Sequence, residues 1–251
     1  MSVYDAGFYD AQEAGSRGSA AAVVPIIVDV LKPDSVLDVG CGVGPWLAEF
    51  AAAGLPVCHG IDGPWVDKTR FSLGPDNLTS FDFNSETAPF RPPLPQGRFD
   101  LVLTLEFLEH VRPEAAPALV EFLTSRSDTV VFSAAIPGQG GTNHVNEQWI
   151  DYWAALFGRQ GFVPFDFLRP LIWNDERIDA WYRQNLIGFF KDAAPANVVA
   201  LAEATLRQQL NNPPRLVHPG ILDIARTSPP PPLAQQVIRK LQRSLHRSNT
   251  L

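Results

Sequence analysis

The sequence has little cysteine, little positive charge and no long apolar run. Its 251 residues include two cysteines, Cys41 and Cys58, and 20 lysine and arginine residues against 27 aspartate and glutamate residues. Two thiols in a chain of this length exclude a disulfide framework, and no Cys/His spacing typical of a zinc site is present. The formal net charge of −7 argues against nucleic acid as a partner, because phosphate recognition needs a basic surface.

No apolar stretch reaches the ~18 residues that a membrane-spanning helix requires. The first residues, MSVYDAGFYDAQEAG, also lack the basic and apolar regions of a signal peptide. We therefore expect no transmembrane segment and a cytoplasmic location. An apolar content of 45% and a charged content of 19% are typical of a globular protein with a sizeable core.

Short β-branched runs alternate with helix-like segments along most of the chain. The runs predict strands near 35–39, 57–61, 78–82, 99–105, 128–134, 162–167 and 185–190, and helices near 20–31, 45–53, 114–125, 147–160 and 196–210. This alternation predicts an α/β fold around a mostly parallel sheet. Pro25 lies inside the first predicted helix, so that helix either begins later than Ser19 or is kinked.

Composition divides the chain into four segments. Residues 1–32 precede the first predicted strand, residues 33–190 carry the α/β pattern, and residues 191–227 are a predicted helical extension. Residues 228–251 begin with SPPPP, which is a stiff spacer, and end in a short basic amphipathic helix. Residues 233–251 are either a docked tail helix or a weak contact to an acidic membrane surface or a partner.

The stretch VLDVGCGVG, residues 36–44, places an aspartate and three glycines at the end of the first predicted strand. Gly40, Gly42 and Gly44 let backbone N–H groups approach a ligand, because no Cβ stands in the way. Their spacing is one residue tighter than the Gly-x-Gly-x-x-Gly of dinucleotide enzymes. Asp38 would repel a pyrophosphate but attract a cation, so the loop predicts a ligand that carries an ammonium group.

Two further aspartates end the next two predicted strands. Asp62 lies where an acidic residue accepts hydrogen bonds from the hydroxyls of a ribose. Asp82 could accept a hydrogen bond from an adenine amino group, and Phe81 and Phe83 on either side of it could stack on the base. Each aspartate alone could be a turn former or a helix cap, but three at successive strand ends favour a nucleoside site.

These stretches resemble the class I, Rossmann-like S-adenosylmethionine (SAM)-dependent methyltransferases. The resemblance covers residues 33–190 and rests on VLDVGCGVG, GIDG, SFDFN and FDLVLTLEFLEHV. It implies a seven-stranded doubly wound sheet whose last strand is antiparallel, with helices on both faces. It also implies SAM as the cofactor and S-adenosylhomocysteine as the product. FSAAIPGQGG, NHVNEQW and WYRQN further resemble bacterial methyltransferases that occur alongside glycan or secondary-metabolite assembly genes.

By matched position, the resemblance implies a set of cofactor-binding residues. Asp38 and the first two glycines would hold the methionine part, Asp62 the ribose and Asp82 the adenine region. The whole set is Asp38, Gly40, Cys41, Gly42, Gly44, Asp62, Gly63, Phe81, Asp82, Phe83, Leu105 and Glu106. In this fold class the segment before the first strand often covers the ligands, so residues 1–32 are a predicted lid.

Methyl transfer from a sulfonium is an in-line displacement, and a hydroxyl acceptor also needs a general base. His110 and His144 follow the fourth and fifth predicted strands, where α/β folds bind ligands. We predict His144 as the base, with His110 and Glu109 as further catalytic candidates. The alternatives are a packing role for His110 and a turn hydrogen bond for His144.

Polar and aromatic residues surround His144. They predict a pocket for a polar acceptor, such as a sugar, and consist of Asn143, Asn146, Glu147, Trp149 and Tyr152. Alternatively, Asn143 or Asn146 caps the following helix. No metal is expected, because nothing in the spacing requires one, although Glu109, His110, His144 and Glu147 could converge on a magnesium ion.

The resulting prediction is O-methylation of a small hydroxylated or carbohydrate-like substrate. The alternatives are N- or C-methylation by the same fold, a non-catalytic module that binds SAM, and a nicotinamide oxidoreductase, which the tight glycine spacing and Asp38 disfavour. Whether the chain forms a homodimer stays open.

Overall fold

The computed structural model describes the backbone of residues 6–211 and the side chains of residues 16–205. The chain divides into two units, residues 1–212 and 213–251. The second unit lies outside the described residues, and with it the predicted proline-rich spacer and the basic tail of residues 228–251. In the part that is described, no helix is both long and apolar enough to cross a bilayer. The cytoplasmic location and the homodimer stay predictions.

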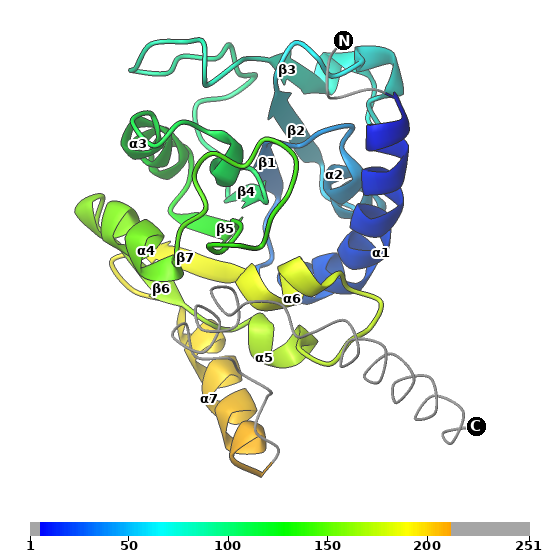
Figure 1. The fold of residues 1–251 in the computed structure, drawn as a ribbon. Helices are drawn as coiled ribbons and strands as arrows, with labels where there is room; N and C mark the ends of the chain where they lie inside the picture. Colours follow the sequence, from blue (N-terminus) through cyan, green and yellow to red (C-terminus); the bar gives the residue numbers. More distant parts are fainter. Residues whose placement is uncertain (1–5, 212–251) are drawn as a thin grey trace, which may run out of the picture. The chain divides into compact units, whose positions relative to one another are not determined.

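Seven strands form one sheet in the order β3-β2-β1-β4-β5-β7-β6 (Figure 1). The strands are β1 (Ser35–Val39), β2 (Val57–Asp62), β3 (Leu78–Ser80), β4 (Leu101–Leu105), β5 (Thr129–Ser133), β6 (Phe162–Phe165) and β7 (Ile187–Lys191). Strand β7 is antiparallel to both of its neighbours, and the pairs from β3 to β5 are parallel. The predicted sheet is therefore confirmed, except that β3 ends at Ser80, and Asp82 follows the strand.

The helices are α1 (Ala6–Leu31), α2 (Pro45–Ala52), α3 (Ala116–Arg126), α4 (Ile150–Arg159), α5 (Arg169–Ile172), α6 (Ala180–Asn185) and α7 (Ala196–Asn211). Three 3₁₀ turns are η1 (Lys68–Arg70), η2 (Pro75–Asn77) and η3 (Leu108–His110). Helix α1 contains Pro25 and begins at Ala6, so a start after Ser19 was wrong. Helix α4 begins after Trp149 without a side-chain cap, so neither Asn143 nor Asn146 caps it.

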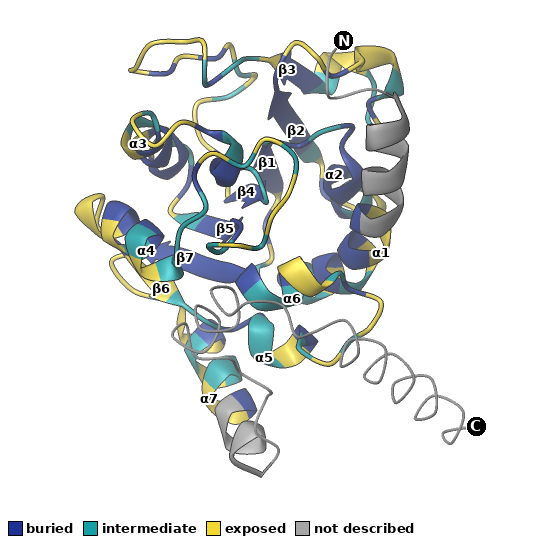
Figure 2. Cartoon of the chain, in the orientation of Figure 1, coloured by how far each residue is buried: buried dark blue, intermediate teal, exposed yellow. Residues whose placement is uncertain are grey.

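The sheet is covered on both faces, with α1 and α2 on one side and α3 and α4 on the other (Figure 1). Successive side chains of a strand point to opposite faces. In β1, Val36 packs with the α1–α2 layer, whereas Leu37 and Val39 pack with the α3–α4 layer. Because both faces are covered, β1 and β4 are buried throughout (Figure 2), which explains their nearly continuous apolar sequences.

The strand order reverses beside β1. The chain runs outward from β1 through β2 to β3 and then crosses to β4 on the other side of β1. Connections on opposite sides leave a crevice at the carboxyl ends of the central strands, which is where α/β sheets bind ligands. The fold therefore places the loops after β1, β2 and β4 around one opening.

Candidate active site

A cavity of about 380 Å³ lies at the carboxyl ends of β1, β2 and β4. This volume falls within the range of small-molecule sites. Eleven of the twelve predicted cofactor residues line it: Asp38, Gly40, Cys41, Gly42, Asp62, Gly63, Phe81, Asp82, Phe83, Leu105 and Glu106. Gly44 does not line the cavity. It is the N-cap of α2, with a φ of 82°, and it positions the helix behind the loop.

The glycine loop is tied to β2. The Gly40 N–H donates to the Ile61 carbonyl at 2.8 Å, and the Gly42 N–H donates to Asp62 Oδ2 at 2.7 Å. A Cβ on Gly40 would lie 2.2 Å from the Phe107 ring, whereas a Cβ on Gly42 would meet nothing within 4 Å. Gly42 therefore faces open space that a ligand can fill. Position 40 requires glycine because any side chain there would collide with the Phe107 ring.

Asp38 and Asp62 are buried carboxylates on the wall of this cavity, 2% and 8% exposed. Burial, and then the charge of Asp62, raise the pKa of Asp38 well above its usual range. Burial also raises the pKa of Asp62, although hydrogen bonds from Gly42, Gly63 and Trp65 oppose that rise. Such a pair is suited to a ligand that brings a positive charge and hydroxyl donors.

The adenine-side candidates differ in accessibility. Asp82 accepts hydrogen bonds from the Asn84 N–H at 2.9 Å and from the Ser85 hydroxyl. Phe83 is 2% exposed and packs in a core of rings, whereas Phe81 is half-buried. Phe81 is the better placed of the two rings to stack on a ligand.

Several lining residues were missed from the sequence because no motif marks them. Ser16 of α1 and Tyr182 of α6 meet across the cavity wall, with 3.2 Å between their hydroxyl oxygens. The Trp46 ring lies edge-on to Tyr182, at a centroid distance of 5.1 Å. Trp65 donates from Nε1 to Asp62 Oδ1 at 3.1 Å. The stretch WYRQN, which contains Tyr182, was marked only by its resemblance to bacterial methyltransferases. No motif marked Ser16 or Trp65 as a cavity residue.

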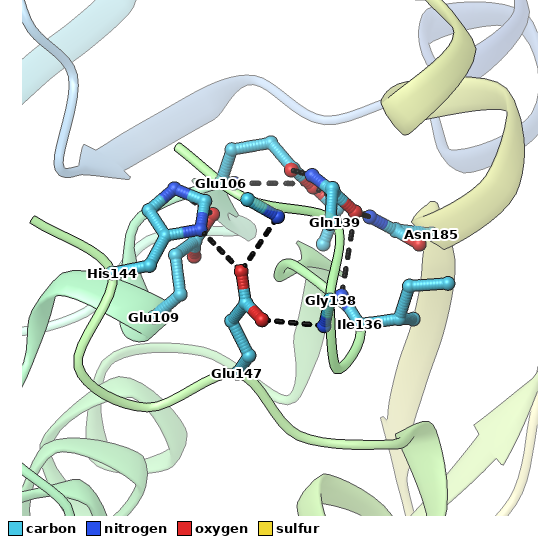
Figure 3. Close-up of polar contacts among 10 residues, drawn as sticks. Glu106, Glu109, Ile136, Gly138, Gln139, His144, Glu147 and Asn185 are labelled. Carbon is cyan, nitrogen blue, oxygen red and sulfur yellow. Dashed lines mark hydrogen bonds and ion pairs between the residues drawn. The ribbon is translucent and has the colours of Figure 1, made fainter. Parts of the chain in front are cut away.

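Glu106, the residue after β4, adopts a φ of 49°, which is strained for a residue other than glycine. Its carboxylate accepts hydrogen bonds from Gln139 Nε2 at 2.7 Å and Asn185 Nδ2 at 3.1 Å. These contacts join β4 to the loop after β5 and to α6 (Figure 3). Burial raises the pKa of Glu106 although these hydrogen bonds oppose it.

A second group of titratable residues lies next to the cavity, which His110 lines: Glu109, His110, His144 and Glu147. His144 Nδ1 lies 3.0 Å from Glu147 Oε1, and His144 Nε2 lies 4.0 Å from Glu109 Oε1 (Figure 3). Glu147 also accepts hydrogen bonds from the Gly138 and Gly140 N–H groups. Burial would raise the pKa of Glu147, but these donors together lower it. Glu147 is therefore an ionised acceptor, and Nδ1 of His144 carries the hydrogen.

Glu109 and His110 have perturbed pKa values. Glu109 is 0% exposed, and neither of its carboxylate oxygens has a hydrogen-bond partner. Burial and then the charge of Glu106 raise its pKa well above the usual range. Burial, and then His144, lower the pKa of His110 to about 4. The two histidine rings meet edge-on, at a centroid distance of 4.9 Å.

The predicted substrate residues do not gather at one place. Of the predicted substrate residues, Asn143 lines the cavity of about 380 Å³, as does the catalytic candidate His110, whereas Asn146, Glu147, Trp149 and Tyr152 do not. Asn146 is buried and accepts a hydrogen bond from Gln148, and Tyr152 packs edge-on to Trp153. Trp149 lines a smaller cavity of about 60 Å³.

Comparison with known proteins decides the family. Residues 21–171 match the family model described as a methyltransferase domain. The chain belongs to this family. This methyltransferase is 34% identical to norajmaline N-methyltransferase of Rauvolfia serpentina, over 42% of the chain and 41% of that protein. It is 33% identical to the probable chloroplastic tocopherol O-methyltransferase of Oryza sativa subsp. japonica, over 42% of the chain and 33% of that protein. These matches span less than half the length of either relative.

Solved structures share the fold of this methyltransferase. A putative O-methyltransferase from Nostoc punctiforme PCC 73102 has a TM-score of 0.53 at 14% identity, covering 73% of this chain and 59% of that one. The magnesium protoporphyrin IX methyltransferase of Synechocystis PCC 6803, solved with bound S-adenosylhomocysteine, has a TM-score of 0.51 at 18% identity, covering 73% and 87%. The implied fold is thereby confirmed.

The enzyme is a SAM-dependent methyltransferase, and its cavity fits this cofactor. Buried Asp38 and Asp62 offer acceptors for an ammonium group and a sugar diol, and Gly42 leaves room for close approach. When bound, SAM would supply a methyl group on a sulfonium leaving group that is already activated.

Proposed function

We propose that this methyltransferase acts on a hydroxyl oxygen of a small polar, carbohydrate-like acceptor, and that His144 takes the acceptor's proton. The observation that carries the proposal is the hydrogen bond between His144 Nδ1 and Glu147. Because Glu147 fixes the hydrogen on Nδ1, Nε2 holds a lone pair, as a general base requires.

The other titratable groups near the acceptor are less suited to this role. A pKa of about 4 makes His110 a weak base at neutral pH, and a pKa of about 12 keeps the Tyr182 phenol protonated. The raised pKa of Glu109 favours its neutral form. His110 lines the cavity and contacts His144, so it would orient the acceptor beside the base.

Polar side chains that line the cavity near His110 favour a polar acceptor. Asn84, Arg112 and Asn143 line it together with His110. On the cofactor side, Asp38 would bind the methionine ammonium, Asp62 the ribose hydroxyls and Phe81 the adenine ring. The lid over residues 1–32 also stays a proposal. Ser19, Ala20, Val23, Val24 and Ile27 of α1 are buried in the core, so this part of the helix would stay in place if a lid opened.

The test compares His144→Gln with His218→Gln, a matched substitution outside the described residues. Full-length protein is incubated with isotopically labelled SAM and matched panels of sugars, phenols and amines, and products are identified by mass. We expect His144→Gln to lower kcat for a hydroxylated acceptor by about 10²–10⁴-fold, with the SAM affinity unchanged by calorimetry. An unchanged kcat would show that His144 is not the base.

A second candidate is N-methylation, which the half-buried Glu106 carboxylate on the cavity wall favours because it could accept a hydrogen bond from an amine N–H. An amine acceptor needs less help from a base. Product from amines alone, at equal rates in wild type and His144→Gln, would select this function. SAM binding with no product from any panel would select a non-catalytic module.

A further inference from the structure

Three metal-ligating side chains meet beside the cavity, which one of them, His110, lines. Glu109 and His110 belong to η3, and His144 belongs to the loop after β5. One ligand atom from each of the three lies within 4.8 Å of the other two. Elements far apart in the sequence thus place a carboxylate and two imidazoles around one point.

Two of these side chains, Glu109 and His110, have buried polar atoms without a hydrogen-bond partner. Both Glu109 oxygens and His110 Nδ1 are buried without a hydrogen bond, and Glu109 is 0% exposed. Leaving a buried polar group unsatisfied costs about 1–3 kcal/mol, and more for a charged one. Unsatisfied groups of this kind indicate a binding partner that the protein chain itself does not supply.

His144 is held as metal-binding histidines are. Its Nδ1 donates to Glu147, and the Gly138 and Gly140 N–H groups fix that carboxylate (Figure 3). Metal-bound histidines nearly always donate their second ring N–H to such an acceptor, which orients the ring and makes the ligating nitrogen more basic. Here the contact turns Nε2 toward Glu109, at 4.0 Å from Oε1.

We propose that Glu109, His110 and His144 bind a divalent transition-metal ion, and that the bound ion inhibits methyl transfer by occupying Nε2 of His144. Two imidazoles and one carboxylate suit Zn²⁺ or Co²⁺ better than Mg²⁺, which prefers oxygen ligands. Ligand atoms at about 2.0–2.1 Å from a tetrahedral ion are roughly 3.3 Å apart. The distance between Nε2 and Oε1 must therefore shorten by less than 1 Å.

The inhibition follows from competition for one lone pair. Nε2 of His144 cannot hold a metal ion and accept the acceptor's proton at the same time. The metal is thus a regulatory ligand and not a cofactor. Only this inhibitory part rests on the proposed base, because binding of the ion requires no assumption about the acceptor.

Binding is tested on the metal-stripped full chain by calorimetry with Zn²⁺ and by the visible absorption of added Co²⁺. We expect a single high-affinity ion per chain. Glu109→Gln and His144→Gln should weaken it by more than about tenfold, and Glu147→Ala, which removes the orienting acceptor, by about 10–100-fold. His218→Gln is the control and should bind as wild type does. A SAM-induced thermal shift in every variant confirms that it is folded.

Equal Zn²⁺ affinity in wild type and the Glu109 and His144 variants would overturn the site.

Turnover measured against Zn²⁺ separates the two proposals. We expect activity to fall in proportion to occupancy. If Zn²⁺ binds at the three residues and turnover does not change, the base role of His144 is wrong and the metal site stands. If no ion binds but His144→Gln loses turnover, the metal site is wrong and the base stands.

Discussion

Asp38 is a carboxylate that the fold buries beside a second one, Asp62. Burial and that neighbouring charge raise its pKa. A carboxyl whose folded-state pKa lies above the unfolded value stabilises the fold below the unfolded pKa, and this contribution is lost as the pH rises through the folded pKa. At neutral pH, Asp38 thus costs stability in the ligand-free protein.

Asp38→Asn removes this cost and also the charge that would bind an ammonium group. We expect the ligand-free variant to be more stable than wild type by about 1 kcal/mol or more, with a gap that widens above pH 4. Its SAM affinity should fall at least about tenfold, which corresponds to the loss of one charge-assisted hydrogen bond. Urea denaturation at pH 5 and pH 8, with calorimetry of SAM binding, measures both. A variant less stable than wild type at pH 8 would contradict the argument.

At the residue scale, the sequence marked the groups that one local motif brings together. Asp38, Gly40 and Gly42 are neighbours in the chain, so their spacing alone predicted a shared ligand. Ser16 and Tyr182 meet only because α1 and α6 pack together, 166 positions apart. No spacing in the sequence encodes such a contact. Glu109 and His144 differ, because they follow the neighbouring strands β4 and β5, and their convergence was among the predictions.

At the scale of an element, the glycine loop contains two positions, 40 and 42, that require glycine for different physical reasons. A Cβ at Gly40 would collide with Phe107, whereas a Cβ at Gly42 would enter the open cavity. We expect Gly40→Ala to lower the free energy of unfolding by ~2 kcal/mol or more, through strain and overpacking.

Gly42→Ala, at a φ of 55°, should cost only the ~1–2 kcal/mol of the left-handed backbone, yet weaken SAM binding strongly. Gly54→Ala, at a φ of 94° in open space outside the site, is the control for backbone strain and should leave SAM affinity unchanged. Chemical denaturation and calorimetry of the three variants check this pattern. Equal SAM affinity in Gly42→Ala and Gly54→Ala would refute it.

Helices α1 and α6 are tied by the hydrogen bond between Ser16 and Tyr182. We expect Ser16→Ala and Tyr182→Phe each to destabilise the protein by about 1 kcal/mol, with a coupling of ~0.5–1.5 kcal/mol in the double variant. Burial raises the pKa of Tyr182 to about 12, so its contribution is lost only as the pH rises from about 10 through 12. Urea melts of the four proteins measure the coupling, and strict additivity would show that the hydroxyls act independently.

Sequence periodicity found the seven strands but not every helix. Parallel strands that are buried on both faces have nearly continuous apolar sequences, and such short runs are easily recognised. Helices α5 and α6 span only 4 and 6 residues, so neither completes two turns of a periodic pattern. The early start of α1 was missed because Gly7, Gly15, Gly18 and Pro25 weaken helix propensity, and packing of the second half of the helix overrides that preference.

For the molecule as a whole, the raised pKa of Asp38 links SAM affinity to pH. An ammonium beside Asp38 favours its charged form, so binding should release a proton at pH values below the raised pKa. We expect SAM affinity to increase with pH through this range. Calorimetry in two buffers of different ionisation enthalpy counts the released protons. Asp38→Asn should remove the buffer dependence, and an equal proton count in the variant would contradict the assignment.

The position of β7 between β5 and β6 has a consequence for biosynthesis. Until Ile187–Lys191 has left the ribosome, β5 is an unpaired edge and β6 has no partner in the sheet. Open edges template intermolecular pairing, so nascent chains halted before Ile187 should aggregate, and those that extend beyond Lys191 should not. Pelleting of arrested chains of increasing length would locate this change. One late strand thus sets the point in synthesis at which the exposed edge of β5 is covered.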